Sequence, residues 1–92
     1  MKPIEVRTVR SSLSKKGFEG KQADHLFYFF YFEGKKTAWW VKISHGAKEM
    51  RQREIKANAM VLGLSASDFH GVLSCEKDHQ WLLAKYRAAQ GT

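Results

Sequence analysis

The sequence predicts a small α+β domain in which a three-stranded antiparallel sheet packs on helices. Three observations indicate this class. Apolar residues before residue 17 recur at spacings of three and four, two strand-like runs flank a glycine turn between residues 25 and 44, and helical spacing returns after residue 47. With 92 residues, of which 43% are hydrophobic, the chain can build one core, so we expect a single domain.

The first expected element is a helix from Ile4 to Lys16. Val6, Val9 and Leu13 form its apolar stripe. Pro3 suits a first helical turn, and Gly17 suits the end of the helix. Residues 18–21 are expected to add a short edge strand.

A β-hairpin is expected to follow. Residues 25–32 and 37–44 are rich in aromatic and β-branched residues, and Glu33-Gly34 resembles the Asp-Gly signal of a two-residue turn. Alternation divides the first strand into one face with Leu26, Tyr28, Phe30 and Phe32 and another with His25, Phe27, Phe29 and Tyr31. Both faces are largely apolar, so one should lie under helices and the other should face a partner subunit or ligand. Trp39 and Trp40 should point to opposite faces.

The rest of the chain is predicted to be helical. A basic amphipathic helix is expected over residues 48–64, and Ser65 with Asp68 should open a short helical segment. Trp81, Leu82 and Tyr86 indicate a last amphipathic helix. We divide the chain into a core module, residues 1–64, and a C-terminal helical extension, residues 65–92, that packs on the same domain.

The net charge of +7 comes from two segments, residues 1–21 with a net charge of +4 and residues 42–56 with +3. A basic surface of this kind suits a polyanion such as RNA or DNA, because each neutralised phosphate releases counterions. A solvated basic face without a ligand is the alternative. The candidate RNA-binding residues are Lys21, Lys42, Lys48, Arg51 and Arg53.

The sequence also predicts where the protein works. Cys75 is the only cysteine and cannot form an intramolecular disulfide, and the N-terminal residues lack the apolar region of a secretory signal. No apolar run is long enough to cross a bilayer. We therefore expect a cytoplasmic protein that does not contact membranes.

A zinc site is not expected. His70, Cys75 and His79 form an H-x4-C-x3-H string, which lacks the paired spacing of zinc sites and a fourth ligand. We expect neither a metal nor another cofactor.

Several short motifs occur in a characteristic order. Lys16-Gly17-Phe18 is followed by a histidine at the head of a strand, a glycine turn with basic residues, a strand that ends in "KISHG", and "KEM" leading to a basic helix closed by "LGLS". This order resembles the HicA toxins of prokaryotic type II toxin–antitoxin pairs over about residues 4–65. The resemblance implies the fold of double-stranded-RNA-binding domains, with a three-stranded antiparallel sheet against two helices.

The resemblance also implies two functional histidines. Residues 23–25, Ala-Asp-His, stand where the family has Gly-Ser-His, so His25 matches the catalytic histidine, although the glycine and serine are absent. Residues 43–45, Ile-Ser-His, stand where the family has a Val-Pro-x-His strand end, so His45 matches the second histidine, with the proline replaced.

The activity implied is that of a ribonuclease that cleaves messenger RNA until a HicB-like antitoxin neutralises it. A histidine titrates near neutrality, so His25 could remove the proton of a ribose 2′-OH and start attack on the adjacent phosphate without a metal. Cationic groups would stabilise the charge that develops on the phosphorane, with Lys21, Lys42, His45 and Arg51 as candidates. His45 could instead protonate the leaving 5′-oxygen.

Two other functions remain open. The chain could be a non-catalytic nucleic-acid-binding module on the same fold, or an interaction domain that associates with itself through its aromatic face. For the aromatic run Phe27–Phe32, core packing plus a contact with a second copy or the antitoxin is favoured over base stacking. The reason is that base-stacking sheets use two or three aromatic residues and not a continuous run.

Overall fold

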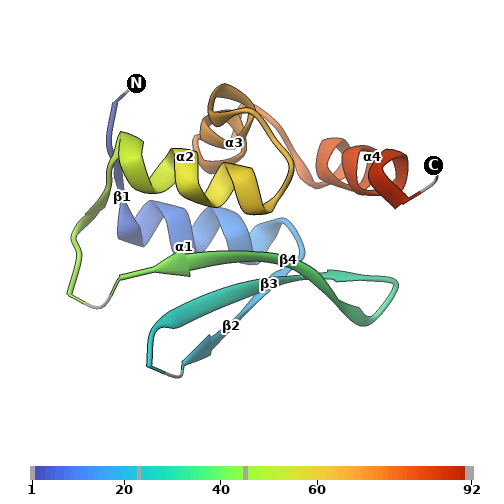
Figure 1. The fold of residues 1–92 in the computed structure, drawn as a ribbon, viewed down its shortest axis with the longest axis horizontal. Helices are drawn as coiled ribbons and strands as arrows, with labels where there is room; N and C mark the ends of the chain where they lie inside the picture. The colour runs from blue at the N-terminus through green and yellow to red at the C-terminus, as the bar shows by residue number, and fades with distance from the viewer. Residues whose placement is uncertain (1, 23, 45, 91–92) are drawn as a thin grey trace.

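The computed structural model describes residues 2–22, 24–44 and 46–90, which form four helices and five strands. Their order is β1 (Ile4–Glu5), α1 (Val6–Lys15), β2 (Phe18–Gln22), β3 (Leu26–Phe32), β4 (Lys35–Ile43), β5 (Glu49–Met50), α2 (Gln52–Val61), α3 (Ala66–Leu73) and α4 (His79–Gln90). In Figure 1 the helices lie on one side of the sheet that β2, β3 and β4 form. The protein is an α+β domain with a three-stranded antiparallel sheet, as the sequence predicts.

β3 is the central strand of this sheet. It pairs antiparallel with β2 on one side and with β4 on the other, so that Phe27 stands between Lys21 and Lys42. The predicted turn at Glu33-Gly34 joins β3 to β4, and its φ angles of 50° and 79° match a type I′ turn. Gly34 adopts this backbone without steric cost. The hairpin prediction is therefore confirmed.

The β3–β4 ladder contains an irregularity midway along its length. Phe29 pairs with Trp40 and Tyr31 pairs with Lys36, so three residues of β4 stand opposite Phe30 alone. The Thr37 hydroxyl donates a hydrogen bond to the Phe30 carbonyl at 2.7 Å and accepts one from the Trp39 N–H at 3.1 Å. This hydroxyl satisfies backbone groups that the ladder leaves unpaired, and so it closes the bulge.

The core lies between the sheet and the helices. The inner face of β3 contributes Tyr28 and Phe30, which are both buried in the core. Tyr28 contacts Arg10 of α1, and the Phe30 ring packs near His79 and Tyr86 of α4. Trp39 also turns inward and packs against Phe30, with ring centroids 5.6 Å apart. One hydrophobic cluster includes residues from α3 and α4 as well, namely Phe69, Val72, Leu73 and Leu82.

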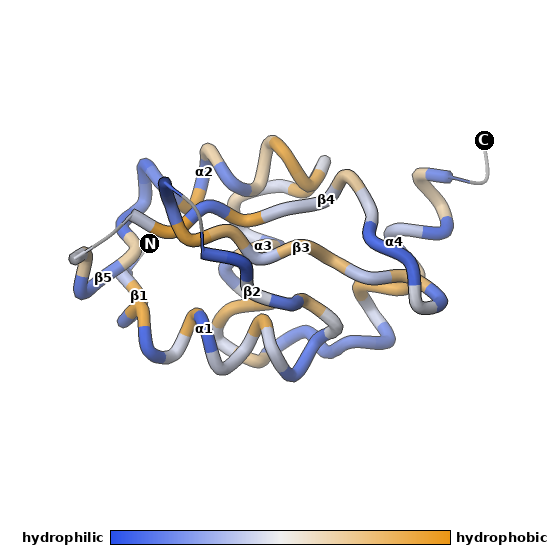
Figure 2. The backbone as a smooth tube through the Cα atoms, turned by 90° about the horizontal axis from the view of Figure 1, so that it is seen from below, coloured by the Kyte–Doolittle hydropathy of each residue, from blue (hydrophilic) through white to orange (hydrophobic). Residues whose placement is uncertain are grey.

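The outer face of the sheet is the face turned away from the helices. Figure 2 looks onto it from below, and in the described part of the chain no helix lies in front of β3 there. Strand register and alternation place eight side chains on this outer face: Glu19, Lys21, Phe27, Phe29, Tyr31, Lys36, Trp40 and Lys42. Its four aromatic side chains are all partly exposed.

Two predicted helix starts are wrong. Ile4 and Glu5 belong to β1, which pairs antiparallel with β5, so the first helix begins at Val6. The helix expected over residues 48–64 begins at Gln52, because residues 49 and 50 form β5. The pairing buries Ile4 and Met50 against the core, and this tertiary gain overrides the local helical pattern.

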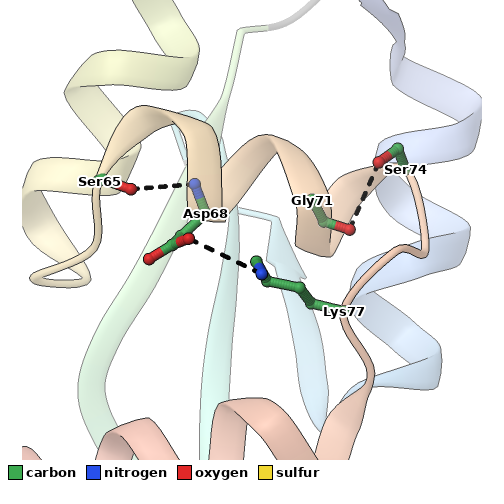
Figure 3. A network of polar contacts seen from close by, with 5 residues as sticks. All are labelled: Ser65, Asp68, Gly71, Ser74 and Lys77. Atoms are coloured by element: carbon green, nitrogen blue, oxygen red, sulfur yellow. Dashed lines mark hydrogen bonds and ion pairs between the residues drawn. The ribbon is translucent and has the colours of Figure 1, made fainter.

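The third helix begins as predicted. The Ser65 hydroxyl accepts a hydrogen bond from the Asp68 N–H at 3.0 Å, which caps α3 (Figure 3). The Asp68 carboxylate also lies 3.8 Å from the Lys77 ammonium. Lys77 in turn places its ammonium 4.8 Å from the centre of the Trp81 ring on α4. These contacts connect α3 to α4 through the intervening loop.

Asn58 of α2 fixes the helix to the exposed edge of the sheet. Its side-chain oxygen accepts a hydrogen bond from the Lys42 N–H at 2.9 Å, and its amide nitrogen donates to the Lys42 carbonyl at 3.2 Å. The same nitrogen donates to the Glu54 carbonyl at 3.0 Å. Asn58 is only 4% exposed. Because its side chain bonds both backbone groups of Lys42, it takes the place of a neighbouring strand at this point of the β4 edge.

Replacement of Asn58 by alanine should lower the free energy of unfolding by about 1–3 kcal/mol, because the partly buried backbone N–H and carbonyl of Lys42 lose their partners. Urea unfolding followed by circular dichroism would measure the change. Lys56→Ala, an exposed substitution in the same helix, is the control and should change stability by less than about 0.5 kcal/mol. Equal stabilities of the two variants would contradict the role given to Asn58.

Candidate functional site

The candidate site lies at the end of the sheet where three strand segments meet. Gln22 at the end of β2 pairs with Leu26 at the start of β3, and Leu26 pairs with Ile43 at the end of β4. His25 directly precedes β3, and Ser44 directly follows β4. The register therefore brings together the two chain segments that contain the predicted histidines.

His25 is exposed at this end of the sheet. Its ring stands edge-on to the Phe27 ring, with centroids 6.4 Å apart and an interplanar angle of 89°. This contact aligns the imidazole with the row of aromatic side chains on the outer face. His25 is thus accessible to a ligand that lies along that face.

His45 lies outside the described residues, so its pairing with His25 stays a prediction. Its described neighbours Ser44 and Gly46 line a cavity of about 170 Å³ between α1 and the end of the sheet. The other residues that line this cavity are Val6, Arg10, Gln22, Leu26, Ile43 and Ala47.

Arg10 is a cation of this cavity that the sequence did not single out. Its Nε donates a hydrogen bond to the Tyr28 hydroxyl at 3.0 Å. The Tyr28 ring packs over Gly20, where a Cβ atom would lie 3.1 Å from the ring. Gly20 therefore leaves the room that Tyr28 needs to hold Arg10. From the sequence alone, Arg7 and Arg10 are both arginines of the same predicted helix and cannot be told apart. The packing of α1 on β2 distinguishes them.

Two of the predicted RNA-binding lysines lie on the outer face. Lys21 and Lys42 are cross-strand neighbours of Phe27, on opposite sides of it, and both are exposed. Directly opposed side chains in such pairs have Cβ atoms about 4.5–5.5 Å apart. Phe27 is thus flanked by two lysine residues in the neighbouring strands.

The other three predicted residues form a second basic group near the start of α2. Lys48, Arg51 and Arg53 are exposed there, and Arg51 and Arg53 line a shallow hollow with Gln52 and Lys56. The Lys48 carbonyl accepts a hydrogen bond from the Val6 N–H at 2.8 Å, which fixes this segment to α1. A further hollow, lined by Lys42 and by Asn58 among others, lies between β4 and α2.

A buried lysine faces the single cysteine on the far side of α1. Lys16 is only 5% exposed, and its ammonium donates a hydrogen bond to the exposed Cys75 sulfur at 3.3 Å. The Ser12 hydroxyl lies 3.4 Å from the same sulfur. The Ser12 hydrogen bond and then the Lys16 ammonium lower the pKa of the Cys75 thiol below its ordinary value of 9.0. Sequence reasoning missed this cluster.

The three residues of the rejected zinc string take part in separate contacts. The His70 Nε2 lies 3.1 Å from the Lys2 carbonyl, Cys75 contacts Ser12 and Lys16, and the His79 ring stands edge-on to Phe30. Within the described ranges, no three His, Cys, Asp or Glu residues are grouped so that they could hold a metal ion.

Comparisons with protein-family models, with curated proteins and with solved structures find no match for this chain. Among the helices of the described residues, none has both the length and the apolar character needed to cross a membrane.

Lys16→Met should move the pH midpoint of Cys75 alkylation upward, toward 9.0. The thiolate is the nucleophile, so the lowered pKa of Cys75 places the midpoint of its reactivity at a lower pH. Loss of the Lys16 ammonium removes one cause of the lowered pKa, so the midpoint should rise. The rate of iodoacetamide labelling, followed by mass spectrometry from pH 6 to pH 10, measures the midpoint. The exposed Lys15 is the matched control, and Lys15→Met should shift the midpoint less. An unchanged midpoint in Lys16→Met would contradict the assignment.

Proposed function

We propose that this chain is a HicA-like toxin, a metal-independent endoribonuclease that cleaves single-stranded messenger RNA. One observation carries the proposal. The histidine that matches the catalytic residue of that family, His25, is exposed at the end of an uncovered face, in contact with Phe27, which Lys21 and Lys42 flank. A general base at the end of a face that also carries lysine side chains suits RNA cleavage, because the cations can stabilise charge on the phosphate.

The fold is compatible with this proposal. One helix, three antiparallel strands and a second helix follow one another as α1, β2, β3, β4 and α2, apart from the short strand β5. This is the order of the double-stranded-RNA-binding type, which we propose as the fold family. Residues 1–64 would form that module, with α3 and α4 as its C-terminal extension.

The proposed reaction begins with proton transfer to His25. The imidazole takes the proton of a ribose 2′-OH, the 2′-oxygen forms a bond to the adjacent phosphorus, and the bond from phosphorus to the 5′-oxygen breaks. His45 would protonate the leaving 5′-oxygen. Lys21 and Lys42 neutralise phosphates along the bound strand, and Arg10 offers a further cation near the strand ends.

The partner and location follow from the same proposal. Such a toxin acts in the cytoplasm, where it meets messenger RNA, and a HicB-like antitoxin would neutralise it there. The basic group formed by Lys48, Arg51 and Arg53 is accessible for RNA or for an acidic surface of that antitoxin.

A non-catalytic RNA-binding module is the second candidate. The observation that favours it is the presence of Ala23 and Asp24 where the resembling family has glycine and serine. In this case the basic side chains would bind RNA and His25 would cleave nothing.

His25→Ala should reduce cleavage of an end-labelled single-stranded RNA by roughly 10²–10⁴-fold, because the general base is lost. The assay is run near pH 7 in EDTA, and His70→Ala is the matched control, because His70 contacts Lys2 instead of the outer face. A substrate with a single 2′-deoxyribose at the cleavage position should resist cleavage. Equal cleavage by the wild type and His25→Ala would refute the role of His25, and intact RNA in both would favour the binding module.

A further inference from the structure

The outer face of the sheet has a composition that is unusual for a surface left to water. Phe27, Phe29 and Tyr31 of β3 and Trp40 of β4 are partly exposed on it, and no described helix covers them (Figures 1 and 2). Contiguous exposed apolar surface marks interaction sites in soluble proteins. Alternate residues of the aromatic run lie on opposite faces of the sheet, so the outer face carries only Phe27, Phe29 and Tyr31 of β3. Sheets that stack bases also use two or three aromatic residues.

The geometry of these rings suits stacking. Alternate residues of one strand are about 6.6 Å apart. The Phe27 and Phe29 rings have centroids 6.1 Å apart and are inclined by only 31°, so they present similarly oriented surfaces. Trp40 stands edge-on to Phe27 at 5.5 Å, and His25 does so at 6.4 Å. The row therefore leads from β3 to the candidate general base.

The charges on this face match a phosphate backbone. Lys21 and Lys42 flank Phe27, and the Lys36 ammonium lies 4.0 Å from the centre of the Phe29 ring. Among the residues that the register places on this face, Glu19 is the single acid. Two copies packed through this face would bring two sets of three lysines together, and such like-charge contact opposes self-association.

We propose that the outer face binds single-stranded RNA by stacking bases on Phe27, Phe29 and Trp40, while Lys21, Lys36 and Lys42 contact the phosphates. Lys36 leaves the Phe29 ring for a phosphate when a base arrives. The inference rests on the proposed function in one respect, because the bound strand is taken to be the substrate that reaches His25. Stacking requires unpaired bases but tolerates any base, since every base has a π face.

Binding to an uncleavable probe tests this platform independently of catalysis. Fluorescence anisotropy is measured with a labelled, unstructured 12-nucleotide 2′-O-methyl RNA, which lacks the attacking hydroxyl. Trp40→Ala should weaken binding roughly five- to hundredfold. Trp81→Ala is the matched control, because that ring also lies beneath two lysine side chains, Lys77 and Lys85, but belongs to α4. It should leave binding unchanged.

A second variant keeps the test decisive if Trp40→Ala fails to fold. Lys21→Gln combined with Lys42→Gln should reduce the slope of log affinity against log salt concentration by about 1.4, at about 0.7 for each phosphate that the protein no longer neutralises. The same sequence in a duplex should bind more weakly than the single strand.

The outcomes separate this inference from the proposed function. Unchanged binding by a folded Trp40→Ala or by the double lysine variant would overturn the platform, even if the wild type cleaves RNA. Equal affinity for duplex and single strand would overturn it as well. Weakened binding in these variants, without any cleavage by the wild type, would support the platform and defeat the ribonuclease. A dimer in light scattering that Trp40→Ala dissociates, together with no RNA binding, would assign the face to a second copy.

Discussion

The alternation of side chains along β3 is the constraint on which both the core and the candidate interface depend. This strand consists only of Leu, Phe and Tyr residues and is hydrogen-bonded on both sides. A slip of one residue in its register would exchange its two faces. Tyr28 and Phe30 fill the core while Phe27 and Phe29 reach the uncovered face. The pairing that stabilises the domain therefore also forms the surface that we assign to RNA.

Buried partners hold the Arg10 guanidinium and the backbone that carries Lys42. The Asn58 amide accepts a hydrogen bond from the Lys42 N–H and donates one to the Lys42 carbonyl. Arg10 donates a hydrogen bond to Tyr28, whose ring uses the space above Gly20. Groups placed in this way need little reorganisation when a ligand binds, which favours electrostatic stabilisation of developing charge. The contacts between the helices and the sheet thus fix the Arg10 side chain and the backbone position of Lys42.

Local signals in the sequence were sufficient for the hairpin, its turn and the cap of α3, because a few neighbouring residues determine each of them. The starts of α1 and α2 could not be predicted, since β1 and β5 pair across a long stretch of chain. The alternation of side chains along a strand correctly predicted that Trp39 and Trp40 point to opposite faces of the sheet. The contact between Lys16 and Cys75 joins positions 59 residues apart, and only the tertiary packing shows it. The role of His45 remains a sequence-based prediction.

The bulge that Thr37 closes preserves the two faces of the hairpin. β4 holds two more residues than β3 between the pair Phe29 and Trp40 and the pair Tyr31 and Lys36. Because this excess is even, side chains on either side of the bulge keep their faces, so Trp40 and Lys36 both lie on the outer face with Phe29 and Tyr31. The two extra residues therefore shift the pairing of β4 with β3 without moving the side chains of either strand to the other face of the sheet.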